Sequence, residues 1–240
     1  MNTIYNPKKY WEERLSGRFN LRGVGHIGFT EHYNAWLYKR KQRCIESYFR
    51  GASLKGKDVL DIGSGTGFFV KWYLEKGANV CGIDITEMSI QKLKRQYNYE
   101  FYTQDISAAD LELSRKFDIV NMWDVMYHIV SPDGFLRAFR NIRNALKVGG
   151  ILLFTDWFGL ADDKRMAEHV QARCLSTYQQ VLPAMGLQLV GTYPLYKFLN
   201  QNNLGRLDEH LAWLYWTLDN FATEIPENNV SLAVWQLRQG

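Results

Sequence analysis

Short apolar runs alternate with longer amphipathic segments between residues 58 and 157. The runs are rich in β-branched and aromatic side chains, whereas the longer segments repeat their apolar positions at helical spacing. Such alternation predicts parallel strands joined by helices that cross over both faces of one sheet. We predict strands over residues 58–62, 79–84, 99–104, 117–122 and 150–157, and helices over residues 68–76, 87–97 and 134–146.

The flanking segments predict a helical cover and an insertion. Thr30, Thr86 and Asp133 are expected N-caps of helices, and Ser176 opens a capping box before a short helix that ends at Gly186. Strands follow at residues 187–193 and 229–237. We therefore predict one α/β domain with a doubly wound, seven-stranded, mostly parallel sheet. Its parts are a helical N-terminal cover (1–56), the core (57–193), an insertion (194–228) and the last strand (229–240).

The insertion contains an apolar stripe with spacings of four, three, four and three residues, which predicts a helix. The stripe consists of Leu207, Leu211, Leu214, Leu218 and Phe221. If the preceding strand is parallel, the insertion leaves the sheet at the carboxyl ends, where open α/β sheets bind ligands. We expect the stripe to pack on the core and the helix to roof a pocket. A homodimer through this helix is the alternative.

The composition is that of an ordinary folded domain, because 46% of the residues are hydrophobic and 22% are charged. The net charge of +4 is too small for the field that duplex nucleic acid binding uses, so no nucleic acid partner is expected. The densest basic run, residues 39–43, is interpreted as a solvated helix face. No window approaches the roughly 20 apolar residues that span a bilayer, so no membrane contact is expected.

The cysteines and the N-terminus point to a reducing compartment. Cys44, Cys81 and Cys174 lie far apart and without ligand spacing, so neither a disulfide framework nor a metal site is predicted. The N-terminus lacks the apolar core of a secretion signal. We therefore expect a cytoplasmic protein.

An apolar strand runs directly into three glycines, Gly63, Gly65 and Gly67, and then into a helix. Only glycine allows so tight a turn and so close an approach of a ligand to the backbone. A dinucleotide fold needs a small residue three positions after its second glycine, where this chain has Phe68. Asp61, which precedes the turn, would repel a diphosphate but can pair with an ammonium group. The turn therefore favours a cationic nucleoside ligand.

Further carboxylates follow the next two strands. Asp84 comes about twenty residues after the glycines, where a carboxylate can accept hydrogen bonds from both ribose hydroxyls. Asp105 follows the third strand, where it can accept a hydrogen bond from an adenine amine while Ile85 and Ile106 sandwich the ring. Together these positions predict a nucleoside site along one edge of the sheet.

Residues 58–157 resemble the class I S-adenosylmethionine-dependent methyltransferases, in which Asp-x-Gly-x-Gly-x-Gly and acids after the second and third strands occur in this order. The resemblance implies S-adenosylmethionine as cofactor, with its methionine portion at Asp61, Gly63 and Gly65. The ribose would lie at Asp84 and the adenine at Asp105 and Ile106. The full set of cofactor-binding candidates is Tyr10, Arg14, Arg40, Asp61, Gly63, Ser64, Gly65, Gly67, Asp84, Ile85, Asp105, Ile106 and Trp123.

The N-terminal candidates come from segments similar to those that cap the cofactor in small-molecule members of the family. They are Tyr10, Arg14 and Arg40, for which ordinary helix-surface positions are the alternative. The resemblance is thinner in this part of the chain than in the core.

Residues 121–128 follow the fourth strand, at the expected point of methyl delivery. Members that methylate nucleic acid amines carry Asn or Asp, then Pro-Pro and an aromatic residue here, and this sequence does not. Methyl transfer from a sulfonium mainly needs alignment of donor and acceptor. A hydroxyl acceptor also benefits from a base, for which His128 is the first candidate, a structural histidine being the alternative. Asp124 and Tyr127 are further catalytic candidates.

The sequence thus predicts a methyltransferase that acts on a hydroxyl group of a small molecule, with an amine acceptor as the alternative. Two other classes compete with it. One is a nicotinamide-dependent oxidoreductase, which Phe68 and Asp61 disfavour. The other is a catalytically silent nucleoside-binding subunit that docks on a partner through residues 207–221.

Overall fold

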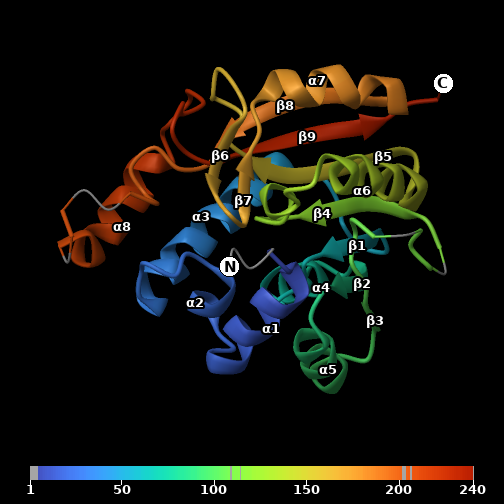
Figure 1. Ribbon diagram of the computed structural model, residues 1–240, viewed down its shortest axis with the longest axis horizontal. Coiled ribbons are helices and arrows are strands. Elements are labelled where there is room, and N and C mark those ends of the chain that lie inside the picture. Colours follow the sequence, from blue (N-terminus) through green and yellow to red (C-terminus); the bar gives the residue numbers. More distant parts are fainter. Residues whose placement is uncertain (1–4, 109, 114, 202–203, 206, 240) are drawn as a thin grey trace.

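A seven-stranded sheet forms the centre of the computed structural model, which describes residues 5–108, 110–113, 115–201, 204–205 and 207–239 (Figure 1). The strand order is β3-β2-β1-β4-β5-β9-β8. In Figure 1 the strands step from β8 at the top to β3 at the bottom. The strands are β1 (Asp58–Ile62), β2 (Asn79–Asp84), β3 (Glu100–Thr103), β4 (Phe117–Met122), β5 (Leu146–Asp156), β8 (Leu187–Pro194) and β9 (Ser231–Leu237).

The sheet is parallel except for its β9 strand. The strands β1 to β5 pair in parallel, whereas β9 runs antiparallel to both β5 and β8, so β8 has the direction of the others. The chain order reverses between β1 and β4, and such a switch point leaves a crevice at the carboxyl ends of the strands. The predicted doubly wound, mostly parallel sheet of seven strands is confirmed.

Helices cover both faces of the sheet. The helices α3 (Glu31–Tyr48), α4 (Phe68–Glu75) and α5 (Glu87–Gln96) contribute to one apolar cluster, and α6 (Pro132–Ala145) and α7 (Leu175–Val181) to the other. Side chains of a strand alternate between the faces, so Val59 belongs to the first cluster and Leu60 to the second. Asp61 therefore points toward the face covered by α3 and α4.

The N-terminal cover is helical, as predicted. It consists of α1 (Pro7–Gly17), α2 (Leu21–Val24) and α3, whose N-caps Asn6, Asn20 and Thr30 accept hydrogen bonds from backbone N–H groups. The first four residues of the predicted cover lie outside the described residues. Among the described helices, none joins sufficient length with sufficient apolar character to cross a bilayer.

Two predicted caps are wrong. The hydroxyl of Ser131, not Asp133, accepts the hydrogen bond from Gly134 N that caps α6. The capping box at Ser176 does not form, because α7 begins at Leu175 and the carboxylate of Asp163 accepts the hydrogen bond from Cys174 N. A loop carboxylate that is distant in sequence has taken the capping role.

Two strand assignments also differ from the prediction. The strand β5 begins at Leu146 instead of residue 150, because Leu146 already pairs with Phe117 before the irregularity at Gly149, where φ is +80°. The sequence analysis missed a hairpin of β6 (Lys164–Ala167) and β7 (Val170–Ala172). The first strand, Lys-Arg-Met-Ala, does not alternate, and the second has only three residues, so neither carries a usable period-two signal. Short 3-10 turns at Met126–His128 (η1) and Pro183–Met185 (η2) complete the elements.

The insertion forms α8 (Leu207–Asp219), but three of the five stripe positions are exposed, and Leu211 and Leu214 are only partly buried. The exposed fractions of Leu207, Leu218 and Phe221 are 60%, 41% and 80%. Asp219 accepts hydrogen bonds from three backbone N–H groups of residues 197–199, and Asp208 accepts from Leu204 N, so these carboxylates fix the inward face. The expectation that the stripe packs on the core is wrong, and α8 projects at the left of Figure 1.

Candidate active site

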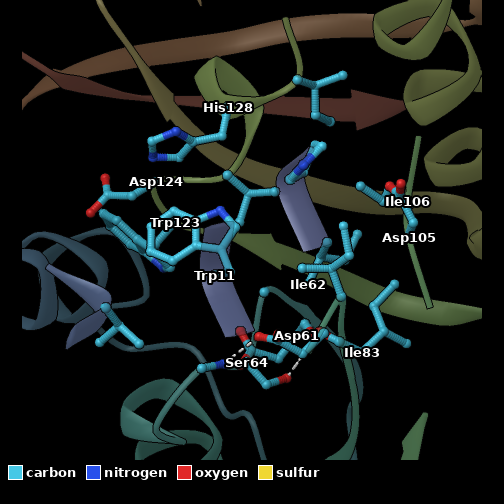
Figure 2. Close-up of a pocket in the computed structure, with 18 of the residues that line it drawn as sticks. Trp11, Asp61, Ile62, Ser64, Ile83, Asp105, Ile106, Trp123, Asp124 and His128 are labelled. Atoms are coloured by element: carbon cyan, nitrogen blue, oxygen red, sulfur yellow. Dashed lines mark hydrogen bonds between the residues drawn. The ribbon is translucent and has the colours of Figure 1, made fainter. Parts of the chain in front are cut away.

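A cavity of about 260 Å³ lies at the carboxyl edge of the sheet, where the predicted switch point would put it (Figure 2). Its walls come from the segments that follow β1, β2, β3 and β4, and from α1, which contributes Trp11 and Leu15. In Figure 2, Asp105 and Ile106 lie across the cavity from Trp123 and Asp124. Within the described chain, no residue of the insertion lines this cavity, so the predicted roof of α8 is wrong.

The glycine turn after β1 has the backbone conformation that only glycine adopts easily. The φ angles of Gly63 and Gly67 are +73° and +83°. A side chain at Gly63 would stand 2.4 Å from Val125, so the turn also packs closely against the segment after β4. Gly63, Ser64 and Gly65 line the cavity, whereas Gly67 begins α4 behind it.

Asp61 presents a buried carboxylate without a cationic partner. Its exposed fraction is 3%, and Asn121 Nδ2 donates a hydrogen bond of 2.6 Å to its Oδ1. Burial raises the pKa of Asp61 to about 7, and the neighbouring carboxylate of Asp84 adds to this effect. Among the described residues, none forms an ion pair with Asp61. A cationic group in the cavity would therefore relieve an uncompensated buried charge.

Asp84 ties the end of β2 to the glycine turn. Its carboxylate accepts hydrogen bonds from Gly65 N at 2.8 Å and from both the backbone and the hydroxyl of Thr86. Burial raises the pKa of Asp84 above its ordinary value, and these donated bonds offset part of the effect. Thr86 precedes α5 as expected, but its hydroxyl serves Asp84 and makes no cap hydrogen bond to the helix.

The segment after β3 supplies the far wall. One Asp105 oxygen accepts hydrogen bonds from the backbone and hydroxyl of Ser107, which fixes the carboxylate at the cavity wall. Ile106 is buried beside it, and Ile85 approaches from β2; all three side chains line the cavity. The structure thus brings the carboxylate of Asp105 and the two isoleucine side chains to one wall of the cavity.

The segment after β4 contains a buried ion pair that the sequence analysis missed. Asp124 has a φ of +56°, and its carboxylate pairs with Lys41 of α3 and accepts a hydrogen bond from Thr155. Burial alone would raise the pKa of Asp124, but the Lys41 ammonium together with hydrogen bonds from Thr155 and Tyr127 outweighs burial, and the pKa lies below its ordinary value. Asp124 lines the cavity as a permanently paired anion.

The basic run at residues 39–43 is not a uniformly solvated face, and that interpretation is wrong. Lys41 and Arg40 are 2% and 6% exposed. Their ends find buried partners: Lys41 pairs with Asp124, and Arg40 donates to the carbonyl oxygen of Pro194. Arg40 does not line the cavity, although it was a cofactor candidate.

His128 lies at the opposite end of the cavity from Asp61 (Figure 2). Its Nδ1 donates to the carbonyl oxygen of His169, at 2.8 Å, because a carbonyl can only accept. Nε2 is therefore the unprotonated nitrogen, and among the described residues none donates a hydrogen bond to it. Burial lowers the pKa of His128 to about 4, and the bond to His169 offsets only part of this effect. The imidazole is neutral at neutral pH.

His169, in the hairpin that the sequence analysis missed, connects His128 to α1. Its ring stacks on those of His128 and Tyr10, and its Nε2 lies 3.3 Å from the Tyr10 hydroxyl, to which Arg14 also donates. Tyr10 and Arg14 thus stand behind the cavity wall and do not line it. A turn histidine between short irregular strands carries no sequence signal by which it could have been found.

Tyr127 is the catalytic candidate that lies away from the cavity. Its ring packs against Trp157 and His128, and it is absent from the lining. Burial raises the pKa of Tyr127 well above its ordinary value, so the phenol stays protonated.

Among the described residues, no cluster of His, Cys, Asp or Glu side chains is arranged to hold a metal ion.

The comparison with known families gives the decisive observation. A family described as "Methyltransferase domain" matches residues 33–190. The chain belongs to the methyltransferase domain family. Membership decides against the nicotinamide-dependent oxidoreductase, in agreement with Phe68 and Asp61.

Several curated relatives of this methyltransferase domain are named ubiquinone biosynthesis O-methyltransferase. The ubiquinone biosynthesis O-methyltransferase of Coxiella burnetii (strain Dugway 5J108-111) is 33% identical over 108 residues, which cover 43% of this chain and 44% of that protein. The protein of that name from Chromobacterium violaceum is 26% identical over 167 residues, covering 67% of this chain and 66% of that protein. The matched part thus spans less than half of the first relative.

Solved methyltransferases share the fold. The magnesium protoporphyrin IX methyltransferase of Synechocystis PCC 6803, with bound S-adenosylmethionine, has a TM-score of 0.64 and 15% identity, with 100% of both chains covered. The N-methyltransferase NodS of Bradyrhizobium japonicum WM9, in complex with S-adenosyl-L-homocysteine, has a TM-score of 0.63 and 15% identity, with 98% of this chain and 100% of that chain covered. At this identity the likeness establishes the methyltransferase fold.

Proposed function

We propose that this methyltransferase uses S-adenosylmethionine to methylate a hydroxyl group of a small molecule. The observation that carries the proposal is the Asp61 carboxylate, which faces the cavity, is almost fully buried and pairs with no described cation. An amino-acid ammonium group supplies the missing charge and a charge-assisted hydrogen bond. The relatives named as O-methyltransferases support the choice of oxygen as acceptor.

The remaining strand ends fit the nucleoside. Asp84 keeps one acceptor position, on Oδ2, for a ribose hydroxyl, because Thr86 donates twice to Oδ1 and Gly65 N donates once to Oδ2. Asp105 and Ile106 hold the adenine, and Ile85 closes its other face. Trp11 and Leu15 of α1 cover the cavity and exclude water from it. When bound, S-adenosylmethionine supplies an electrophilic methyl group on a positively charged sulfur.

His128 receives the proton of the acceptor. Its neutral Nε2 accepts a hydrogen bond from the acceptor hydroxyl and so directs an oxygen lone pair toward the methyl carbon. The low pKa of about 4 makes His128 a weak base toward a free hydroxyl. As the oxygen–carbon bond forms, the oxygen becomes strongly acidic, and even a weak base then takes its proton. Asp124, which pairs with Lys41, and Tyr127, whose ring packs against His128 outside the cavity lining, remain secondary candidates.

An amine acceptor is the alternative chemistry, and it makes a separable prediction. An amine with a free lone pair needs no base before attack, so His128 would matter little to the rate. Small acceptors remain the expected class, and neither nucleic acid nor membrane is an expected partner. The homodimer and the cytoplasmic location also stay predictions.

The test combines binding with transfer. Calorimetry should show S-adenosylmethionine binding, and a methyl-labelled cofactor should label simple phenols and catechols in preference to the matched anilines. Absence of binding would overturn the proposal, and selective labelling of the anilines would replace oxygen by nitrogen. Transfer only in the presence of a cell extract would favour a silent subunit that needs a partner.

A further inference from the structure

Asn121 lies directly beside Asp61 in the sheet. The two residues are register partners on the parallel strands β4 and β1, and Asn121 is fully buried. Its Nδ2 donates to Asp61 Oδ1 at 2.6 Å. Its Oδ1 accepts from Trp123 Nε1 at 2.7 Å and from the Tyr73 hydroxyl at 3.2 Å. The amide thus joins an acid at one end of the cavity to an indole on the wall.

The chemistry of the indole fixes which way the amide points. An indole N–H can only donate, so the oxygen of Asn121 must face Trp123 and its NH2 group must face Asp61. A reversed amide would set its NH2 group against the indole N–H and its oxygen against a carboxylate. Asp61 Oδ1 is consequently kept as an acceptor, and its other oxygen is left for a ligand.

Packing holds the indole itself in place. Trp123 stacks on Phe69 with ring centroids 4.8 Å apart and an interplanar angle of 10°, and it lines the cavity. Two hydrogen bonds therefore connect Trp123 in the cavity wall, through the buried amide of Asn121, to Asp61 before the glycine turn. We call this series of side chains the relay. No described cation takes part in it.

We propose that Asn121 is a positioning residue that keeps Asp61 an acceptor aimed at the ammonium group of the cofactor, and that Trp123 orients Asn121 through its indole N–H. The inference rests on the proposed function. It adds two residues that act through Asp61 and explains why Trp123 is an indole instead of another aromatic ring.

The surroundings of Asp61 give this relay its importance. Asp84 of β2 opposes ionisation of Asp61, and Tyr73 of α4 and Tyr38 of α3 are protonated phenols. The Lys41–Asp124 pair neutralises itself. Against these groups and against burial, the Asn121 and Ser64 donors hold the pKa of Asp61 down to about 7. Loss of the amide donor should therefore raise that pKa.

The experiment has a readout in the ligand-free protein. Selective ¹³C labelling of aspartate carboxyl carbons, with Asp61→Asn to assign the signal, follows the titration of Asp61 by NMR. Asn121→Leu should raise its pKa by at least about one unit and weaken S-adenosylmethionine binding at pH 7 about tenfold, which corresponds to about 1.4 kcal/mol. Trp123→Phe, which keeps the ring but not the N–H, should shift both quantities in the same direction by less.

Trp72→Phe is the matched control, because it removes another buried indole hydrogen bond, to Glu46, away from the cavity. It should leave both the titration and the affinity unchanged. Wild-type titration and affinity in Asn121→Leu would overturn the proposal, and so would a Trp72→Phe effect equal to that of Trp123→Phe. If Asn121→Leu does not fold, the Asp61 titration and the cofactor affinity of Trp123→Phe test the proposal by themselves. If the wild type binds no S-adenosylmethionine, the proposed function fails, while the ligand-free titration still decides whether Asn121 controls Asp61.

Discussion

The two ends of the cavity are built in different ways. At the end formed by β1, β2 and β3, two of the three acids are held by neighbours in sequence, since Thr86 donates to Asp84 and Ser107 to Asp105, each two positions apart. Asp61 is the exception, because Asn121 of β4 donates to it across 60 positions. At the end formed by β4, the key contacts join distant segments. Lys41 reaches Asp124 across 83 positions, and Tyr10 meets His169 across 159.

This difference separates the two tasks of the site. Local turns at strand ends hold Asp84 and Asp105, whereas Asp61 also depends on Asn121 of β4. The other end depends on where the cover and the β6–β7 hairpin dock, so these docked segments can change while the local turns stay the same. The acceptor is therefore expected to depend on α1, α3 and the hairpin, which experiments on each end should separate.

The largest effect is expected where the cover is fixed to the core. Lys41→Met leaves Asp124 as a buried carboxylate without its partner, which should lower the free energy of unfolding by about 3 kcal/mol. Urea denaturation measures this change in the free energy of unfolding. Lys39→Met, on the exposed side of the same helix, should change little, and adding Asp124→Asn to Lys41→Met should recover part of the loss. Equal denaturation midpoints for Lys41→Met and Lys39→Met would show that the ion pair does not stabilise the folded protein.

The next effect is on the rate of methyl transfer. His128→Asn retains a donor for the His169 carbonyl oxygen but loses the Nε2 acceptor, so kcat should fall about 100-fold while cofactor affinity changes little. His128→Gln makes the opposite change: its longer side chain places an amide near the position of Nε2, but it loses the hydrogen bond to the hairpin. A kcat of His128→Asn close to that of wild type would exclude His128 as the proton acceptor and favour an amine substrate.

A comparable effect concerns pH. Because the pKa of Asp61 is about 7 in the folded protein and lower in the unfolded chain, the folded state binds more protons between about pH 4 and 7. Asp61 thus contributes stability at low pH that is lost as the pH rises to 7. Asp61→Asn should be more stable relative to wild type at pH 7.5 than at pH 4.5, by up to about 3 kcal/mol.

The contribution of His128 to stability changes with pH in the opposite direction, since its pKa of about 4 lies below that of an unfolded histidine. Its neutral form contributes stability that is lost as the pH falls from about 6.5 to 4. The comparison of Asp61→Asn with wild type cancels this contribution, because both proteins retain His128. A stability difference that does not vary between pH 4.5 and 7.5 would contradict the burial of an uncompensated Asp61.

The smallest effect is expected at the solvent-facing stripe of α8. Leu207→Ser and Phe221→Ser should each change the free energy of unfolding by no more than about 0.5 kcal/mol, because both side chains are mostly exposed. Ala212→Ser lies on the buried face of the same helix and should cost more. A loss of several kcal/mol in Phe221→Ser, with a change of oligomeric state in sedimentation, would indicate the homodimer.

Much of the fold and one end of the site could be predicted from the sequence. Alternation of strands and helices fixed the sheet, and Asp61, Asp84 and Asp105 follow strands whose ends must meet. The face of α8 could not be predicted, because Asp208 and Asp219 face inward through hydrogen bonds from backbone N–H groups outside the helix, which periodicity does not show. Lys41 and His169 carry no local signal, since their roles exist only through partners in distant segments.

The central claim is that a buried, uncompensated Asp61 binds a cationic amino-acid group. The direct measurement compares by calorimetry the affinities for S-adenosylmethionine and for 5′-methylthioadenosine, a neutral thioether without the amino-acid portion. The wild type should prefer S-adenosylmethionine about 100-fold, and Asp61→Asn should reduce this preference to tenfold or less. An undiminished preference in Asp61→Asn would contradict the account.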